Sequence, residues 1–252
     1  MHASGEDEEY VVKAIAEGVS LLGFSDHAPF AYRDGYVSNY KMTLEEADGY
    51  FSSISHLREK YADRIEIKIG YEAEYYPELW EDTLVAWRKN PPEYLLLGQH
   101  YTNYENIGGV RGDHSYRVPG LPDKERLTRY VDRIIDGMAT EQFSYLAHPD
   151  IIAFEGERDF YLSEMSRIIR ASQKYGMPLE FNLLGLSEGR CYPSLDFWRL
   201  VGSEGLSAVI GCDAHSPSRV ADKGELSRAK EMLTSCGVKV LERVELRRPR
   251  LY

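Results

Sequence analysis

Short apolar segments recur along the chain, and each is followed by a residue that can bind a metal ion or hydrogen-bond a ligand. In the clearest case, an apolar run from residue 208 to the glycine at 211 is followed by Asp213 and His215. A short apolar run bounded by glycine is typical of a buried strand, and residues i and i+2 of an extended segment point the same way. Five further runs end in the same manner, at His27 with Asp26, Glu72, His100 with Gln99, His148 and Asn182. This recurrence predicts one polar site to which several strand ends contribute.

Strands and helices are predicted to alternate along the whole chain. The predicted strands cover residues 19–25, 65–70, 94–98, 143–147, 178–182, 207–211 and 238–241. Helical patterns cover residues 6–17, 43–63, 77–89, 123–138, 160–175, 194–201 and 223–235, with a capping box at Thr43 and Glu46. Alternation without a break in composition predicts one domain over residues 1–252, built from right-handed βαβ units around a parallel sheet. A barrel is favoured over an open sheet, because a barrel gathers the C-terminal ends of all its strands at one mouth.

Three segments between these elements are predicted to be loops, at residues 28–42, 101–122 and 183–192. The second has no clear periodicity and contains four glycines together with Arg111 and His114. Loops of this length inside compact domains are usually functional or disordered. The glycine-rich stretch 108–112 lacks the Gly-Lys-Ser/Thr ending of a phosphate-binding P-loop, so that motif is excluded.

Composition narrows the class of protein. The net charge of −11 argues against nucleic acid as a standing partner, because phosphate backbones need a basic surface. Three cysteines without a CxxC motif indicate a reducing compartment and no disulfide framework. No signal peptide and no apolar run of about 18 residues is present, so we expect a soluble, cytoplasmic protein that does not enter the membrane. The oligomeric state is left open.

Histidines are concentrated at the strand ends. Of seven in the chain, four lie at or just beyond a predicted strand, and these are His27, His100, His148 and His215. One such histidine would be assigned to packing, but four together with Glu72 and Asp213 indicate a metal site. Imidazoles combined with carboxylates suit zinc, iron(II) or manganese. Such ions lower the pKa of bound water and act as Lewis acids on phosphoryl or acyl oxygens.

The order and spacing of these motifs resemble those of the polymerase-and-histidinol-phosphatase (PHP) superfamily, and within it the histidinol-phosphate phosphatases. The matching segments are 25–29, 70–75, 98–101, 147–150, 179–182 with 185–186, 192–194 and 211–215. Together they cover nearly the whole chain. The subfamily resemblance depends on three shorter pieces, the His-Ala-Pro at 27–29, the Glu-Phe-Asn at 180–182 and the Tyr-Pro-Ser at 192–194.

The resemblance implies a distorted (β/α)7 TIM-like barrel that carries two or three divalent metal ions at the strand ends. It implies hydrolysis of L-histidinol phosphate, a small phosphorylated metabolite, to L-histidinol and phosphate in histidine biosynthesis. Glu72 would bridge two ions, Asp213 would bind the first, and His100 and His148 the second. His27, His215 and His2 would bind the third, and Asp213 and His215 would act in catalysis.

One departure from the family pattern concerns the start of the chain. The family begins with a strand that ends in His-x-His, and neither this motif nor its strand appears before His2. Either the start has been assigned too late or the chain is naturally truncated. We therefore expect the chain as given to bind fewer metal ions and to be weakly active or unstable.

Candidate substrate-binding residues lie in the loops. For the phosphate group we expect Arg190 first and Arg111, His114 and Arg117 second, and we add Asn182 at its strand end. Either Glu74 or Asp150 would receive the cationic groups of histidinol phosphate. Two alternatives stay open: a related PHP phosphoesterase acting on nucleotides, phosphotyrosine or nucleic-acid ends, and a degenerate barrel that binds or regulates without catalysis.

Overall fold

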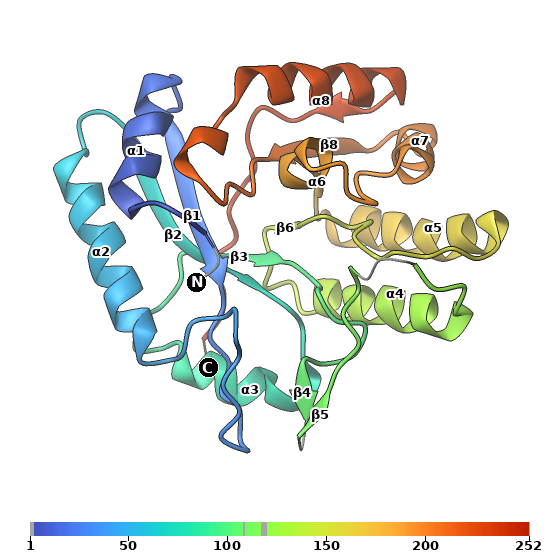
Figure 1. Ribbon diagram of the computed structural model, residues 1–252, viewed down its shortest axis with the longest axis horizontal. Coiled ribbons are helices and arrows are strands. Elements are labelled where there is room, and N and C mark those ends of the chain that lie inside the picture. Colours follow the sequence, from blue (N-terminus) through green and yellow to red (C-terminus); the bar gives the residue numbers. More distant parts are fainter. Residues whose placement is uncertain (1–2, 108, 117–119, 252) are drawn as a thin grey trace.

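The computed structural model describes residues 3–107, 109–116 and 120–251. Seven parallel strands form one curled sheet in the order β1-β2-β3-β6-β7-β8-β9 (Figure 1). Their bounds are β1 Leu21–His27, β2 Glu66–Ala73, β3 Tyr94–Leu97, β6 Tyr145–Leu146, β7 Leu179–Asn182, β8 Ser207–Gly211 and β9 Lys239–Val240. Each corresponds to a strand that the sequence predicts. Within the described residues no strand precedes β1, and β1 and β9 form the two ends of the sheet.

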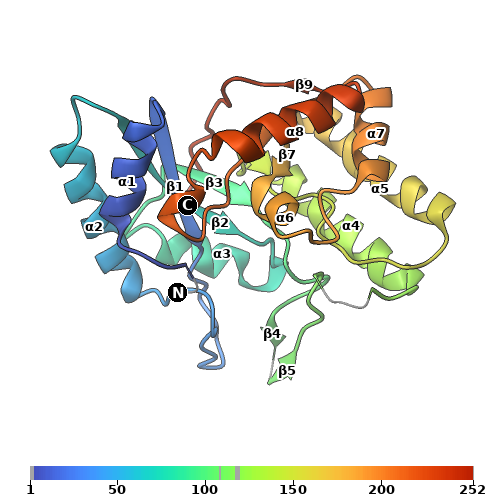
Figure 2. The same cartoon turned by 45° about the horizontal axis from the view of Figure 1, so that its top comes forward.

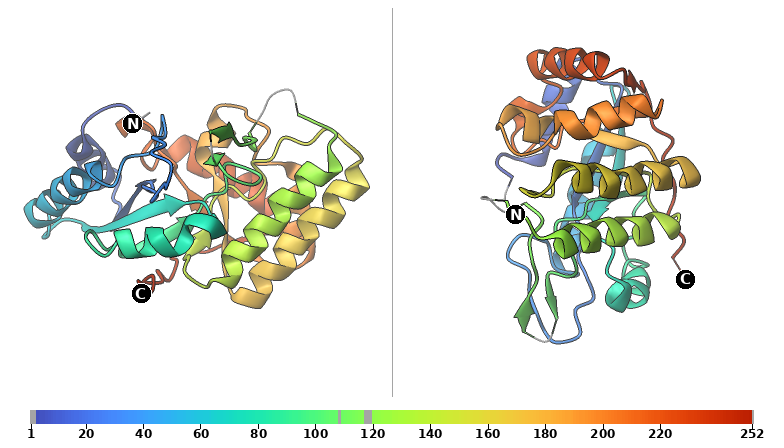
Figure 3. Two further views of the ribbon diagram at one scale, coloured as in Figure 1. Left: turned by 90° about the horizontal axis from the view of Figure 1, so that it is seen from below. Right: turned by 90° about the vertical axis from the view of Figure 1, so that its right-hand side faces the viewer.

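Helices surround the sheet and cover its outer face (Figure 1). They are α1 Asp7–Ala16, α2 Glu46–Lys60, α3 Pro77–Ala86, α4 Lys124–Ala139, α5 Arg158–Tyr175, α6 Leu183–Ser187, α7 Leu195–Ser203 and α8 Lys223–Ser235. The right-hand view of Figure 3 shows α8, α7, α5 and α4 stacked side by side along one flank. The predicted α/β fold and distorted barrel are therefore confirmed, in the form of a curled half-barrel.

The Tyr94 side chain, from β3, lies against the backbones of the neighbouring strands β2 and β1. A Cβ atom on Gly70 of β2 would lie 2.6 Å from the Tyr94 ring, and one on Gly23 of β1 would lie 2.4 Å from the Tyr94 hydroxyl. That hydroxyl donates to the Phe24 carbonyl at 2.8 Å. Two strands therefore lack side chains at these positions so that a third can place an aromatic ring against their backbones.

Two predicted loops contain regular structure. Residues 183–192 begin with α6, because the Asn182 side chain accepts from the Gly185 backbone N–H at 3.0 Å and caps the helix. Residues 101–122 contain a short antiparallel hairpin, β4 Asn106–Ile107 and β5 Val110–Arg111. The hairpin and the loop between β1 and α2 project from the same side of the molecule (Figure 2).

The capping box predicted at Thr43 is present, although the helix begins later than expected. Glu46 accepts from the Thr43 N–H at 2.7 Å, and the Thr43 hydroxyl accepts from the Glu46 N–H at 3.2 Å. The regular part of α2 begins only at Glu46. Helix ends commonly contain such a tight first turn.

The segment after β9 runs along the opposite side of the sheet from the mouth, near the starts of the strands. Arg247 donates through its guanidinium to the carbonyls of Tyr175 and Gly176 at the end of α5. Arg250 donates to the Thr140 carbonyl at the end of α4, and its backbone exchanges hydrogen bonds with the Gln142 amide. Cations at helix C-termini are favoured by the exposed carbonyl groups there. None of the helices in the described ranges combines the length and apolar character needed to cross a membrane.

We predict that Gly70→Ala destabilises the fold by about 1–3 kcal/mol, because the added methyl group overlaps the Tyr94 ring. Gly49→Ala is the matched control, since Gly49 lies in α2 with open space around its Cα and alanine is the better helix former. This control should gain about 0.5–1 kcal/mol. Urea denaturation of both variants measures the free energies of unfolding. Equal changes in the two variants would contradict the packing described for Tyr94.

Candidate metal centre

Four side chains meet at the C-terminal ends of β1, β2, β3 and β6. His27 is the last residue of β1 and lies opposite Glu72 in the parallel register with β2. His100 follows β3 and His148 follows β6. Because neighbouring parallel strands end at the same edge, residues from distant parts of the sequence converge here as the strand pattern predicts.

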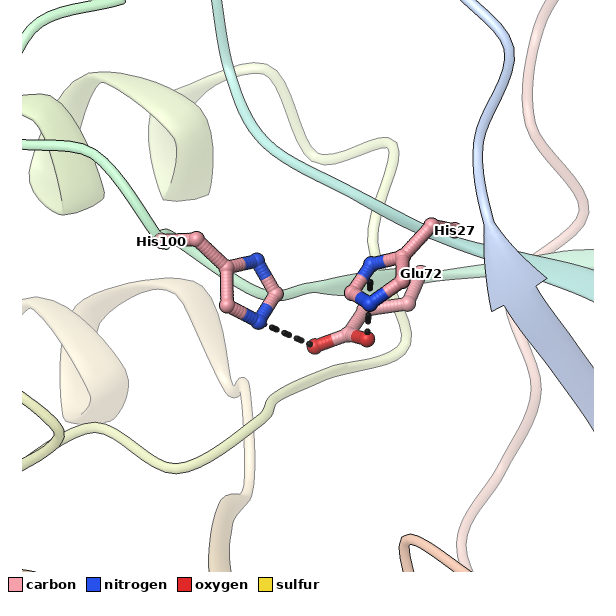
Figure 4. Close-up of side chains that lie close together, drawn as sticks. All are labelled: His27, Glu72 and His100. Atoms are coloured by element: carbon pink, nitrogen blue, oxygen red, sulfur yellow. Dashed lines mark ion pairs between the residues drawn. The ribbon is translucent and has the colours of Figure 1, made fainter. Parts of the chain in front are cut away.

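Glu72 lies at the centre of this group. Its Oε2 is 3.4 Å from His27 Nδ1, and its Oε1 is 2.8 Å from His148 Nε2 and 3.6 Å from His100 Nε2. Figure 4 shows the Glu72 carboxylate between the imidazoles of His27 and His100. The ring centroids of His27 and His148 are each 4.9 Å from that of His100, so His100 contacts both of the other histidines.

The donor atoms of this group fit a divalent transition metal ion. One ligand atom from each of His27, Glu72 and His100 lies within 4.8 Å of the others. Atoms bound to one zinc ion at about 2.1 Å can be at most about 4.2 Å apart, so only a small contraction is needed. Nδ1 of His148 is buried and makes no hydrogen bond within the described residues, which leaves a further donor atom available. Imidazole and carboxylate together are ligands that zinc, iron and manganese accept.

Burial makes the site electrostatically demanding. It raises the pKa of Glu72 to about 7, and the nearby His100 opposes this shift. Burial likewise raises the pKa of Glu180 to about 7. The Glu180 carboxylate accepts from the backbone N–H of His148 at 3.0 Å. A cation bound at the strand ends would stabilise both carboxylates in their charged form.

Two glycines make room for these two carboxylates. A Cβ on Gly98 would lie 2.0 Å from Glu72 Oε1, and one on Gly211 would lie 1.7 Å from Glu180 Oε1. The backbone is also strained at the site, since His148 has a φ of 30° and Asp213 a φ of 44°. Non-glycine residues in this region each cost of order 1–3 kcal/mol and cluster at functional sites.

Asp213 and His215 form a second part of the site, after β8. Asp213 Oδ2 accepts from the Asn182 amide at 3.1 Å, and the same amide nitrogen donates to Glu180 Oε2 at 3.0 Å. His215 Nδ1 lies 3.0 Å from the Asp213 carbonyl oxygen. These hydrogen bonds connect Asp213 through Asn182 and Glu180 to the backbone of His148. Asp213 and His215 are not members of the compact group of His27, Glu72 and His100.

The predicted substrate-binding residues differ in burial and in distance from the histidine group. Arg190 lies over the rings of Tyr116 and Tyr192, and the Tyr192 ring contacts His148. His114 is half-buried beside His100, with a ring separation of 6.2 Å, whereas Arg111 is exposed on β5. The amide of Asn182 is engaged in the three internal hydrogen bonds given above. His2 and Arg117 lie outside the described residues.

Neither carboxylate expected to receive the cationic part of a substrate is available for it. Glu74 is fully buried and forms an ion pair with Lys41 at 2.9 Å. Asp150 is buried and accepts from the Ser194 backbone N–H at 2.5 Å. Glu180 is not among the predicted site residues, although a signal exists, because a charged residue inside the buried strand β7 needs a partner.

Residues 1–183 match the protein-family model described as the PHP domain. The chain belongs to the PHP-domain family. A probable histidinol-phosphatase of Deinococcus radiodurans is 25% identical over 224 residues, which cover 87% of this chain and 84% of that protein. A probable histidinol-phosphatase of Schizosaccharomyces pombe is 25% identical over 264 residues, which cover 97% of this chain and 86% of that protein.

Among solved structures, the fold resembles that of histidinol phosphate phosphatase from Lactococcus lactis, which was crystallised with zinc, L-histidinol and phosphate. The TM-score is 0.69, the identity is 18%, and the match covers 96% of this chain and 94% of the other. At this identity the likeness establishes that the two PHP-type folds agree over nearly their whole lengths.

We predict that Gly98→Ala lowers metal affinity at least about tenfold, because the new methyl group displaces the Glu72 carboxylate. Zinc binding is measured by competition with a chromophoric chelator, and circular dichroism checks that the fold is retained. Gly49→Ala serves again as the control and should bind zinc as the unchanged chain does. Unaltered affinity in a folded Gly98→Ala variant would remove Glu72 from the metal site.

Proposed function

We propose that this PHP-family phosphoesterase hydrolyses L-histidinol phosphate to L-histidinol and phosphate. The observation that carries the proposal is the group of three histidines around Glu72 at the mouth of the half-barrel. It is supported by the similarity to two probable histidinol-phosphatases over most of the chain, and by the L. lactis enzyme that holds zinc, L-histidinol and phosphate. We treat residues 1–252 as one catalytic domain.

Two or three divalent metal ions would be held at the strand ends, around the Glu72 carboxylate. Glu72 would be shared between ions, with His27 and His100 completing the compact donor group and His148 adding a donor beside it. Asp213 and His215 would bind from the end of β8. Divalent ions there would lower the pKa of an attacking water and polarise the phosphoryl oxygen. Asp213 and His215 would take part in the reaction itself, because they lie at the end of β8 on the side of the mouth, with His215 partly exposed.

The remaining residues would bind the substrate and hold the site in shape. Arg190 is our candidate for the phosphate group, and Glu188 and the Tyr192 hydroxyl hold its guanidinium in place through contacts of 2.8 Å. A planar guanidinium with a fixed orientation suits a phosphate oxygen pair. Arg111 and His114 would contact the substrate from the hairpin side. Asn182 would orient Asp213 through its amide.

The decisive test is phosphate release from L-histidinol phosphate against a panel of nucleotides, phosphotyrosine and other phosphomonoesters. We expect selective turnover of L-histidinol phosphate, with metal content determined on the same sample. Selective turnover of another member of the panel would assign a different phosphoesterase activity. No turnover and no bound metal would indicate a non-catalytic barrel.

Metal removal gives a second prediction. Dialysis against a chelator should abolish turnover, because the proposed reaction needs divalent ions to lower the pKa of the attacking water and to polarise the phosphoryl oxygen. Added zinc, manganese or iron(II) should restore it, and activity is measured as phosphate release before and after. Full activity in a sample shown by elemental analysis to hold no metal would contradict the proposed chemistry.

We further predict that Arg190→Met raises KM or lowers kcat/KM about 10- to 100-fold. This is the usual effect of removing a charged hydrogen-bond donor from a phosphate group. Arg199→Met is the control, since Arg199 is exposed on α7. It should leave both constants unchanged. If Arg190→Met behaves like the control, the phosphate group is bound elsewhere.

A further inference from the structure

We propose that Arg126 is a positioning residue that holds Arg190, the expected phosphate-binding residue, in place through Tyr116. Arg126 lies in the first turn of α4 and fixes the backbone of residues 113–116. This segment carries the Tyr116 ring against which the Arg190 guanidinium lies. The inference rests on the proposed function, because it takes Arg190 as the residue that binds the phosphate group.

The Arg126 guanidinium is buried among acceptors from the loop that follows β5, and its side chain is 2% exposed. Nε donates to Asp113 Oδ2 at 2.6 Å. Nη2 donates to the carbonyls of His114 and Ser115 at 2.8 and 2.9 Å, and Nη1 donates to the Ala153 carbonyl at 3.0 Å. One planar group thus binds three consecutive residues of a single loop segment, together with a carbonyl from a second loop.

The loop segment that Arg126 binds lies between the chain segments that follow β3 and β6. On one side, the Ser115 N–H donates to the His100 carbonyl at 2.6 Å. On the other side, the Ala153 N–H donates to the Ser115 carbonyl at 3.2 Å. Because the Arg126 guanidinium binds the carbonyls of both Ser115 and Ala153, it sets the position of the loop segment relative to the strand ends that carry the histidine group.

Tyr116 connects this loop segment to Arg190. The Arg190 guanidinium carbon lies 5.2 Å from the centroid of the Tyr116 ring and 5.9 Å from that of the Tyr192 ring. The two rings meet edge to face, with their centroids 5.9 Å apart. Aromatic faces fix the plane of a guanidinium, and that plane decides how well its donors meet two phosphate oxygens. A displaced Tyr116 would therefore leave Arg190 held from the Tyr192 side alone.

The experiment must separate this role from a purely structural one, which predicts a loss of stability and no dependence on Arg190. Arg126→Met keeps an unbranched side chain and removes every donor. Arg126→Lys keeps the charge, but a compact ammonium cannot reach all the acceptors that the planar guanidinium serves. Ile134→Val is the control for stability, because Ile134 is buried in the same helix and belongs to no part of the site.

The first readout is hydrogen–deuterium exchange of the peptide that contains residues 113–116, in the zinc-loaded protein. We expect faster exchange of this peptide in Arg126→Met than in the unchanged chain, because the segment loses its three hydrogen bonds to α4. Exchange within α5 should stay the same. Ile134→Val should show no selective change in the peptide. This readout needs no substrate.

The second readout is the affinity of the zinc-loaded protein for inorganic phosphate, measured by calorimetry with metal content determined on the same samples. We expect a loss of about 5- to 20-fold in Arg126→Met and about 2- to 5-fold in Arg126→Lys, because a contact that is out of place is weakened and not removed. Adding Arg126→Met to Arg190→Met should cost less than about threefold more, because no guanidinium is left to position. Bound metal should be equal in all variants.

The positioning role is overturned if folded Arg126→Met binds phosphate as the unchanged chain does, if its effect multiplies in full with that of Arg190→Met, or if lost metal explains the weaker binding. Should Arg126→Met not fold, Arg126→Lys must show the same dependence on Arg190. Selective hydrolysis of L-histidinol phosphate with independent effects would uphold the proposed function and reject this inference. Coupled effects on phosphate affinity without that hydrolysis would uphold the inference and reject the proposed substrate. An unchanged chain that binds no phosphate would reject both.

Discussion

The burial of the Glu72 carboxylate is the constraint on which the site depends. A carboxylate at the end of a central strand, with its pKa raised to about 7 by burial, needs positive charge or proton donors around it. Three imidazoles converge on it, and Gly98 leaves the space that it occupies. The left-handed backbone of His148 is maintained at a cost that the surrounding contacts offset. The close approach of a buried carboxylate and three imidazoles would be unfavourable in an apolar pocket without a cation. A cation shared among these four side chains would make it favourable.

Much of this arrangement could be predicted from the sequence, because the strand ends are marked by local pattern. Short segments of four to seven residues predict the seven strands, and the parallel order then brings His27, Glu72, His100 and His148 to one edge. The hairpin at β4 and β5 could not be predicted, since strands of two residues carry no periodicity. Helix α6 was missed because it is only five residues long and depends on a cap supplied by Asn182.

The roles of Glu74 and Asp150 show where local pattern fails. Each follows a strand and is an acidic residue near the mouth, so the sequence favours contact with a cationic substrate. Glu74 instead pairs with Lys41, 33 positions earlier in the chain, and Asp150 accepts from the backbone of Ser194, 44 positions later. The pairing of a carboxylate with a distant loop is decided by tertiary packing, and no spacing rule reveals it. Glu180 is the opposite case, because an acidic residue within a buried strand is itself a signal.

The segment after β9 has a consequence for how this protein tolerates change. The guanidinium groups of Arg247 and Arg250 donate to backbone carbonyls at the ends of α5 and α4, whereas the backbone of this segment bonds the side chains of Ser144 and Gln142. A backbone carbonyl does not depend on the side chain of its residue, so Thr140 and Tyr175 can vary without loss of these contacts, whereas Gly176 is restricted by its φ of 58°. Arg247 is not equivalent to a lysine, because it serves two carbonyls with one planar group. Along the guanidinium contacts, sequence divergence should therefore be easier at Thr140 and Tyr175 than at Arg247.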